Sequence, residues 1–189
     1  RADGFSATNE AAGFLFDPDA DGYRNASLSA SVEHELAAGH TLVLRTLATR
    51  ATTHFDSGIG SDDLNRQRLA STALESRNRL ADGWRSTLRL ARGSDHQHTE
   101  GSFPSFFDTD QDQATWQNDL DALGGQLVAG LEARREKVAS DTLFTRLTRR
   151  QQAVFGGYSA SLDAQRVEAS LRHDDDSQFG GHATGKLAW

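Results

Sequence analysis

The stretch Ala26-Ser27-Leu28-Ser29-Ala30-Ser31-Val32-Glu33 decides the fold class. Its even positions are apolar and its odd positions are small or polar, which is the period of two expected of a β-strand with two different faces. A second alternating segment, with Leu42 and Leu44 on one side, begins directly after Gly39. Two alternating segments joined by a short glycine turn predict a β-hairpin.

The same hairpin pattern recurs along the chain. Turn centres are expected at Gly39, Asp82, Gly124 and Asp163, which are 43, 42 and 39 residues apart. Longer polar connections are expected between the hairpins, over roughly 55–66, 96–112, 137–150 and 174–182. Short turns that alternate with longer loops, between strands of ~10 residues or more, are typical of transmembrane β-barrels. The sequence therefore predicts an all-β, antiparallel transmembrane barrel of which the chain holds about eight or nine strands.

A soluble antiparallel sheet would also alternate, and the segments 69–90 and 131–155 contain many residues with high helix propensity. Strict alternation over several segments favours the barrel, because helices do not produce it. The positions that alternate with the apolar ones also carry charges, as the wet interior of a barrel requires. These charged residues are Glu75, Arg77, Arg85, Arg89, Glu132 and Arg134.

Composition excludes several classes of protein. The 189 residues include no Cys, so a disulfide scaffold and a Cys-ligated metal site are both excluded. Mean hydropathy is −0.60, and no run of 18 apolar residues could form a transmembrane helix. A net charge of −7 argues against a nucleic-acid partner. Hydrolase, phosphate-loop and dinucleotide motifs are absent from the sequence, so we expect no enzyme.

The two ends of the sequence suggest a piece of a larger protein. The chain starts at Arg1 without a leader pattern, and it stops at Trp189 inside an alternating segment. We therefore expect residues 1–189 to be one partial barrel domain. The composition of the chain is also too polar for an ordinary soluble core, because Ile, Met and Cys are scarce while Ser, Thr, Arg and Asp are common.

An acidic motif near the start resembles the first half of a calcium loop. In Asp17-Pro18-Asp19-Ala20-Asp21-Gly22, three carboxylates at alternate positions precede a glycine that permits a sharp turn. An EF-hand needs Glu or Asp at the twelfth position of its loop, and because that position is Leu28 here, an EF-hand is excluded. Further calcium ligands would have to come from Asp56 and from Asp62 or Asp63. A solvated acidic turn is the alternative.

His96-Gln97-His98 has the spacing of two metal ligands at alternate positions of a strand, but no carboxylate partner is expected near it.

Several motifs together resemble the TonB-dependent cobalamin receptors of Gram-negative outer membranes. The resemblance covers the whole chain and is carried by Asp3-Gly4-Phe5, Asp17-x-Asp19-x-Asp21-Gly22-Tyr23, Thr53-His54-Phe55-Asp56, Gly130-Leu131-Glu132-Ala133-Arg134-Arg135-Glu136 and Arg172-His173-Asp174-Asp175-Asp176-Ser177-Gln178-Phe179-Gly180. It implies a 22-stranded barrel with a plug, whose middle strands lie in this chain without the plug or the TonB box.

The resemblance also implies a site and a ligand. Calcium would be held by Asp3, Asp17, Asp19, Asp21, Asp56 and Asp63, with Asp62 as an alternative to Asp63. Cobalamin contacts would fall at Ser57 and at Thr109 in the next long loop, whereas the loop containing Asp176 would be structural. The expected partners are cobalamin, outer-membrane lipid and, for the full-length receptor, TonB. Alternatives are a ferric-siderophore receptor, a passive outer-membrane channel, an outer-membrane enzyme and a soluble calcium-binding β-domain.

Overall fold

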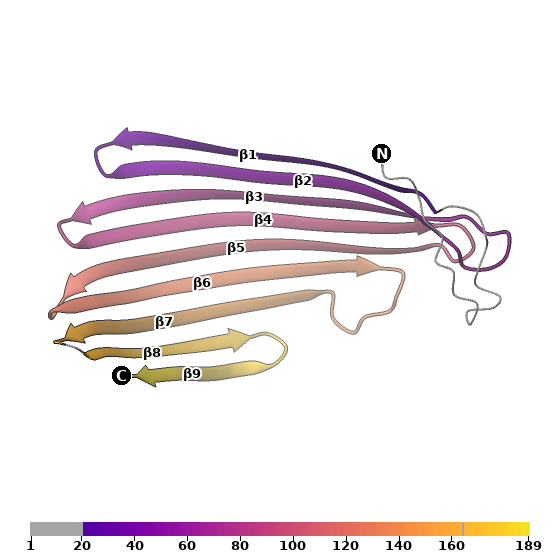
Figure 1. Ribbon diagram of the computed structural model, residues 1–189. Coiled ribbons are helices and arrows are strands. Elements are labelled where there is room, and N and C mark those ends of the chain that lie inside the picture. The colour runs from indigo at the N-terminus through magenta and orange to yellow at the C-terminus, as the bar shows by residue number, and fades with distance from the viewer. Residues whose placement is uncertain (1–20, 164) are drawn as a thin grey trace.

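The computed structural model describes residues 21–163 and 165–189, which form one antiparallel sheet of nine strands in sequence order (Figure 1). The strands are β1 (Tyr23–Ala37), β2 (His40–Phe55), β3 (Asp63–Ala81), β4 (Trp84–Glu100), β5 (Ser105–Ala122), β6 (Gly125–Ser140), β7 (Thr148–Leu162), β8 (Gln165–Asp176) and β9 (Gly180–Ala188). The predicted all-β, antiparallel class is confirmed. No helix long and apolar enough to span a membrane occurs among the described residues.

All four predicted turn centres are confirmed at one end of the sheet, here called the short-turn end. Three of the hairpins are joined there by two residues, at positions 38–39, 82–83 and 123–124, and the fourth turns at Asp163, where Leu162 pairs with Gln165. Gly39, Gly83 and Gly124 have φ values of 77°, 71° and 76°. Glycine adopts this left-handed backbone without steric cost. At 123–124 both turn residues are left-handed, with Leu123 at a φ of 55°, as a type I′ turn requires, whereas at 38–39 and 82–83 only the second residue is.

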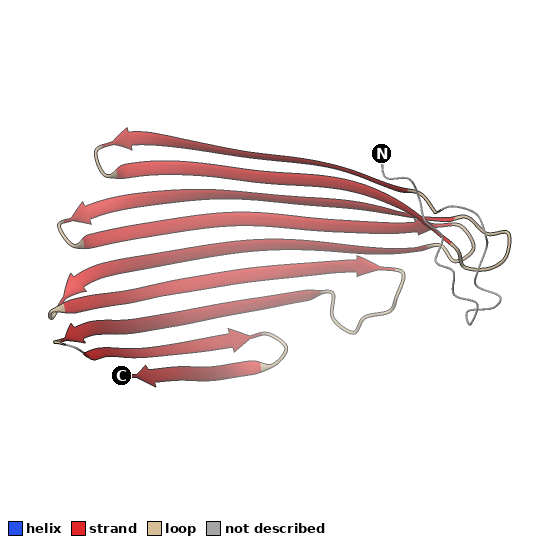
Figure 2. Cartoon of the chain, in the orientation of Figure 1, coloured by secondary structure: helices blue, strands red, loops and turns tan. Residues whose placement is uncertain are grey.

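The connections at the opposite end, the loop end, are shorter than predicted. They comprise residues 56–62, 101–104, 141–147 and 177–179, and the strands extend into the remainder of the predicted loops (Figure 2). Residues 96–100 and 105–112, for example, belong to β4 and β5. The prediction was wrong here because it took polarity as a sign of a loop, whereas these strands continue as paired, polar segments.

Strand register separates the sheet into an apolar face and a polar face. Directly opposite residues share a face, and one row across the sheet runs Leu88, Trp116, Leu131, Val154. The apolar face, defined by this row, also carries the exposed side chains Leu28, Val32, Leu44, Leu74, Leu90, Leu171 and Leu187. The polar face carries the charged residues predicted to face a barrel interior, including Glu75 opposite Arg89.

Ion pairs cross the polar face from strand to strand. Arg45 of β2 lies 3.8 Å from Glu75 of β3. Arg77 of β3 approaches Glu33 of β1 at 3.6 Å, and Arg172 of β8 approaches Glu132 of β6 at 3.3 Å, each across an intervening strand. Lys186 donates a hydrogen bond of 3.1 Å to Glu168. These opposite charges on different strands stabilise the chosen register, because a one-residue slip of a strand would move its charged side chains to the other face, away from their partners.

The sheet is a single layer without a hydrophobic core. It exposes 13354 Å², whereas a compact monomer of this mass, 20.6 kDa, would expose roughly 8,900 Å². Only Val43, Ala73, Ala153 and Ala160 are buried hydrophobic residues among those described. Within the described residues, β1 pairs only with β2 and β9 only with β8, so the sheet is not closed. Both its apolar face and its two edges require a partner or a lipid environment.

Candidate functional site

Asp63, the first residue of β3, joins two loops at the loop end. Its side chain is 2% exposed. One carboxylate oxygen, Oδ2, accepts a hydrogen bond of 2.5 Å from the Ser57 hydroxyl. The other, Oδ1, accepts from the Ser102 amide at 2.8 Å and from the Ser102 hydroxyl at 3.1 Å. A single carboxylate therefore ties the loop at 56–62 to the loop at 101–104.

The second of these loops is built to receive that carboxylate. Gly101 has a φ of 125°, and a Cβ added there would lie 2.1 Å from Asp63 Oδ1. Only glycine combines this backbone conformation with so close an approach. Glycine at position 101 therefore allows the carboxylate of Asp63 to come close enough to accept the hydrogen bond from the Ser102 amide.

The loop at 56–62 is also ordered by its own hydrogen bonds. The Ser61 hydroxyl accepts from the Ser57 amide at 2.9 Å and donates to the Gly58 carbonyl at 2.7 Å. At the start of the loop, the His54 amide donates to the Gly22 carbonyl at 2.8 Å. These contacts place the described end of the acidic motif next to the loop that carries Asp56 and Asp62.

The sequence-predicted site residues are brought together only in part. Asp3, Asp17 and Asp19 lie outside the described residues, and Asp21 directly precedes Gly22. Ser57 and Asp63 contact each other, and Asp56 adjoins Ser57 in the same loop. Thr109 lies in β5 on the polar face and not in a loop as predicted, because β5 already begins at Ser105.

The two alternative acidic residues differ in their accessibility to a metal ion. Both Asp63 oxygens already accept hydrogen bonds, whereas Asp62 is 63% exposed and its Oδ1 lies 2.7 Å from His54 Nδ1. Of the two, Asp62 offers the more accessible carboxylate. No cluster of three or more His, Cys, Asp or Glu side chains arranged for a metal occurs within residues 21–163 and 165–189.

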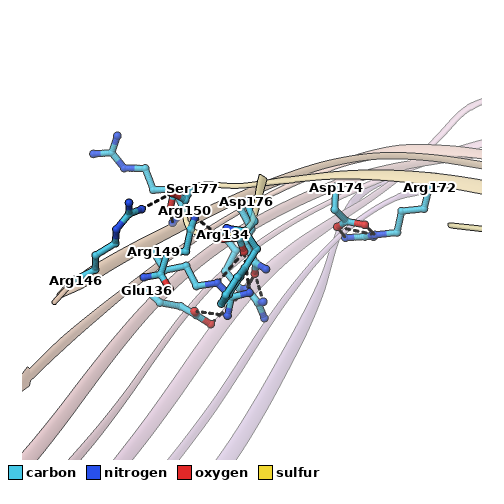
Figure 3. A network of polar contacts seen from close by, with 12 residues as sticks. Arg134, Glu136, Arg146, Arg149, Arg150, Arg172, Asp174, Asp176 and Ser177 are labelled. Carbon is cyan, nitrogen blue, oxygen red and sulfur yellow. Dashed lines mark hydrogen bonds and ion pairs between the residues drawn. The ribbon is translucent and has the colours of Figure 1, made fainter. Parts of the chain in front are cut away.

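A second buried carboxylate, Asp176, orders the turn between β8 and β9 (Figure 3). Its Oδ2 accepts a hydrogen bond of 2.8 Å from Arg149 Nε and forms an ion pair with Arg149 Nη2, also at 2.8 Å. Its Oδ1 accepts a hydrogen bond of 2.8 Å from the Gln178 amide. Arg149 also lies 3.7 Å from Glu136 and 5.3 Å from the centre of the Phe179 ring. The carboxylate thus ties β7 to the loop that follows β8.

Both buried carboxylates are held in their ionised form. Hydrogen bonds from Ser57 and Ser102 keep the pKa of Asp63 below its usual value. Burial alone would raise the pKa of Asp176, but the hydrogen bonds from Arg149 and from the Gln178 amide lower it to about 2. A carboxylate that accepts several hydrogen bonds is stabilised in its charged form.

Acid should loosen the loop end, and only at low pH. A group whose pKa is lower in the folded state stabilises the fold above its unfolded pKa, which is ~3.9 for Asp, and that stabilisation is lost as pH falls through the folded value. We expect hydrogen exchange of the Gln178 amide, corrected for intrinsic pH effects, to stay constant down to about pH 4 and to rise as pH approaches 2. Exchange of the Ser102 amide, which reports on Asp63, should likewise rise only below the usual pKa of Asp. The Gly83 amide at the short-turn end is the reference. A rise between pH 5 and 7 would contradict the assignment.

Sequence reasoning missed one polar cluster on the apolar face. His96 Nδ1 and His98 Nε2 lie 3.1 Å and 3.2 Å from Asp108 Oδ1, so the histidine pair does have a carboxylate neighbour. The expectation of none was wrong, because residues 96–112 were predicted as one loop, whereas most of them belong to two strands that pair with each other. The signal that would have revealed this cluster is the pairing of β4 with β5, in which His96 lies directly opposite Asp108.

No family model matches the chain, and no curated protein matches it.

Proposed function

We propose that the chain forms part of the wall of a TonB-dependent outer-membrane receptor that imports cobalamin through binding and gating, without covalent chemistry. One observation carries the membrane part of this proposal: nine neighbouring strands expose an apolar face on one side and a charged face on the other. A transmembrane barrel needs this combination, because one face meets lipid and the other meets water. An all-β fold of this kind is compatible with an outer-membrane location.

The loop end is the proposed ligand-binding end. Hydrogen bonds through Asp63 already join two loops there, and Asp56 and Asp62 add carboxylates at the same place. In the proposal, calcium bound by Asp3, Asp17, Asp19, Asp21, Asp56 and Asp63, with Asp62 as the alternative, neutralises these carboxylates and holds the loops in one arrangement. Ordering the loops in advance lowers the entropic cost of binding a large ligand. Ser57 and Thr109 are the proposed ligand contacts.

Calorimetry on the membrane-reconstituted protein that carries this chain tests the proposal. Calcium should bind, and cobalamin should bind about tenfold or more tightly with calcium than without it, because ordering costs are removed before the ligand arrives. The double variant Asp19→Ala, Asp21→Ala should lose this dependence. Asp82→Ala, Asp121→Ala removes the same charge near the short-turn end and should retain it.

Other outcomes would redirect the proposal. Unchanged cobalamin affinity in the Asp19, Asp21 variant would remove calcium from the mechanism. Binding of a ferric chelate with no response to cobalamin would identify a siderophore receptor instead. Flux of small solutes without energy coupling would identify a passive channel.

A further inference from the structure

The apolar face becomes charged abruptly toward the loop end. One row of directly opposite residues runs Leu90, Ala114, Ala133 and Gln152 across β4 to β7. The next outward-facing row, two residues further along each strand, consists of Arg92, Asp112, Arg135 and Arg150. Three guanidinium groups and one carboxylate thus border the apolar region; we call Arg92, Arg135 and Arg150 the arginine border.

Two arginines of this border face each other, and the one carboxylate of the row, Asp112, forms its ion pair elsewhere. Arg135 lies directly opposite Arg150 on the neighbouring strand. Asp112 forms its ion pair with Arg92, at 3.8 Å, and neither Arg135 nor Arg150 has an ion pair within the described part of the chain. Arg50 and Arg68, on the same face of β2 and β3, form a second such pair. Like charges directly opposite destabilise a sheet, so an anion between them would be stabilising.

A groove on the apolar face leads to the same arginines. It has a volume of about 690 Å³, and its lining includes Leu74, Leu90, Ala114 and Ala133 together with Arg92, Arg135 and Arg150. The alanines leave room between the larger leucine side chains. An occupant of this groove would have an apolar body along the alanines and an anionic group at the arginines.

We propose that this groove binds the phosphate-bearing headgroup and the first acyl segment of an anionic membrane lipid. Arginine forms paired hydrogen bonds with phosphate oxygens, and it is more weakly hydrated than lysine, which suits a site beside hydrocarbon. The apolar floor selects a lipid over inorganic phosphate, since a soluble anion would leave the groove unfilled. The inference rests on the proposed placement of this face in a membrane.

Trp116 provides the measurement, because it lies on the apolar face and lines an adjoining groove with Ala114 and Ala133. The protein carrying this chain is reconstituted into phosphatidylcholine bilayers doped with brominated phosphatidic acid or with brominated phosphatidylcholine. We expect brominated phosphatidic acid to be enriched about tenfold at Trp116 relative to brominated phosphatidylcholine, because basic residues beside a membrane surface attract anionic headgroups. Arg135→Gln, Arg150→Gln should abolish the enrichment while quenching by brominated phosphatidylcholine persists.

A matched control removes the same charge from the polar face. Arg85 and Arg89 belong to β4, and their side chains lie on the polar face, opposite the groove. The double variant Arg85→Gln, Arg89→Gln should leave the lipid preference unchanged. Equal quenching by both brominated lipids would overturn the lipid site while leaving the membrane placement intact. Displacement of the phosphatidic acid by inorganic phosphate would also overturn it, in favour of a soluble anion. Absence of quenching by either lipid would overturn the membrane placement itself, and this inference with it.

Discussion

Leu131→Arg is expected to destabilise the protein by about 2 kcal/mol or more when it is folded in a bilayer. Leu131 lies on the apolar face between Trp116 and Val154, and its side chain is 49% exposed in the isolated sheet. An arginine on the lipid face of a barrel costs ~2–4 kcal/mol at the bilayer midplane and less toward the interfaces. The same substitution at an exposed position in water is within roughly 0.5 kcal/mol of neutral. Urea unfolding in lipid vesicles measures the difference.

Gln117→Arg is the matched control for this prediction. Gln117 lies next to Trp116 in β5 but on the polar face, opposite Thr87 and Gly130, and its amide donates a hydrogen bond to Asp119 at 3.1 Å. An added guanidinium there would have a carboxylate within reach, so we expect little change in the free energy of unfolding. Equal effects of the two substitutions would show that both faces meet the same environment. That result would favour the soluble β-domain over a barrel.

Sequence alone could predict the strands and their two faces, because alternation is a local property. Each hairpin needs only its own residues: Leu42 and Leu44 follow Gly39 with the same period as Leu28 and Val32 before it. A one-residue slip would reverse the faces, so the pattern determines the register as well. The short turns were equally predictable, since glycine or aspartate stands at every one of them.

The ends of the strands and most of the site were not predictable in this way. Polar residues such as His96 and Asp108 occur equally well in a loop and in a strand. Only their pairing across β4 and β5 shows that they belong to strands. The link from Asp63 to Ser102 joins residues 39 positions apart, with a whole hairpin between them. Asp63 was predicted as a metal ligand from its place in the loop expected next to the acidic motif and from the family resemblance, whereas its serine partners have no sequence signature.

The second large effect on the free energy of unfolding is expected when Gly130 is replaced, because the space beside this glycine does not admit a side chain. Gly130 lies in β6 directly opposite Phe155 in β7, and the Arg172 guanidinium lies 5.8 Å from the centre of the Phe155 ring. A Cβ at Gly130 would be 2.4 Å from Phe155 Cζ and 2.7 Å from the Trp116 carbonyl oxygen. The ring could rotate away, but the carbonyl oxygen belongs to the backbone of β5 and could move only if the strands separated.

Gly130→Ala should therefore lower the free energy of unfolding by about 1–3 kcal/mol, the usual cost of overpacking. The sign is informative, because replacing glycine in a strand ordinarily stabilises by ~0.5–1 kcal/mol. Gly156→Ala is the control, since its Cβ would lie at an ordinary 3.6 Å from the Val128 carbonyl. Adding Phe155→Leu should recover part of the loss and leave the part caused by the Trp116 carbonyl, which a double-mutant cycle resolves. A stabilising Gly130→Ala would mean that Phe155 does not cover this glycine.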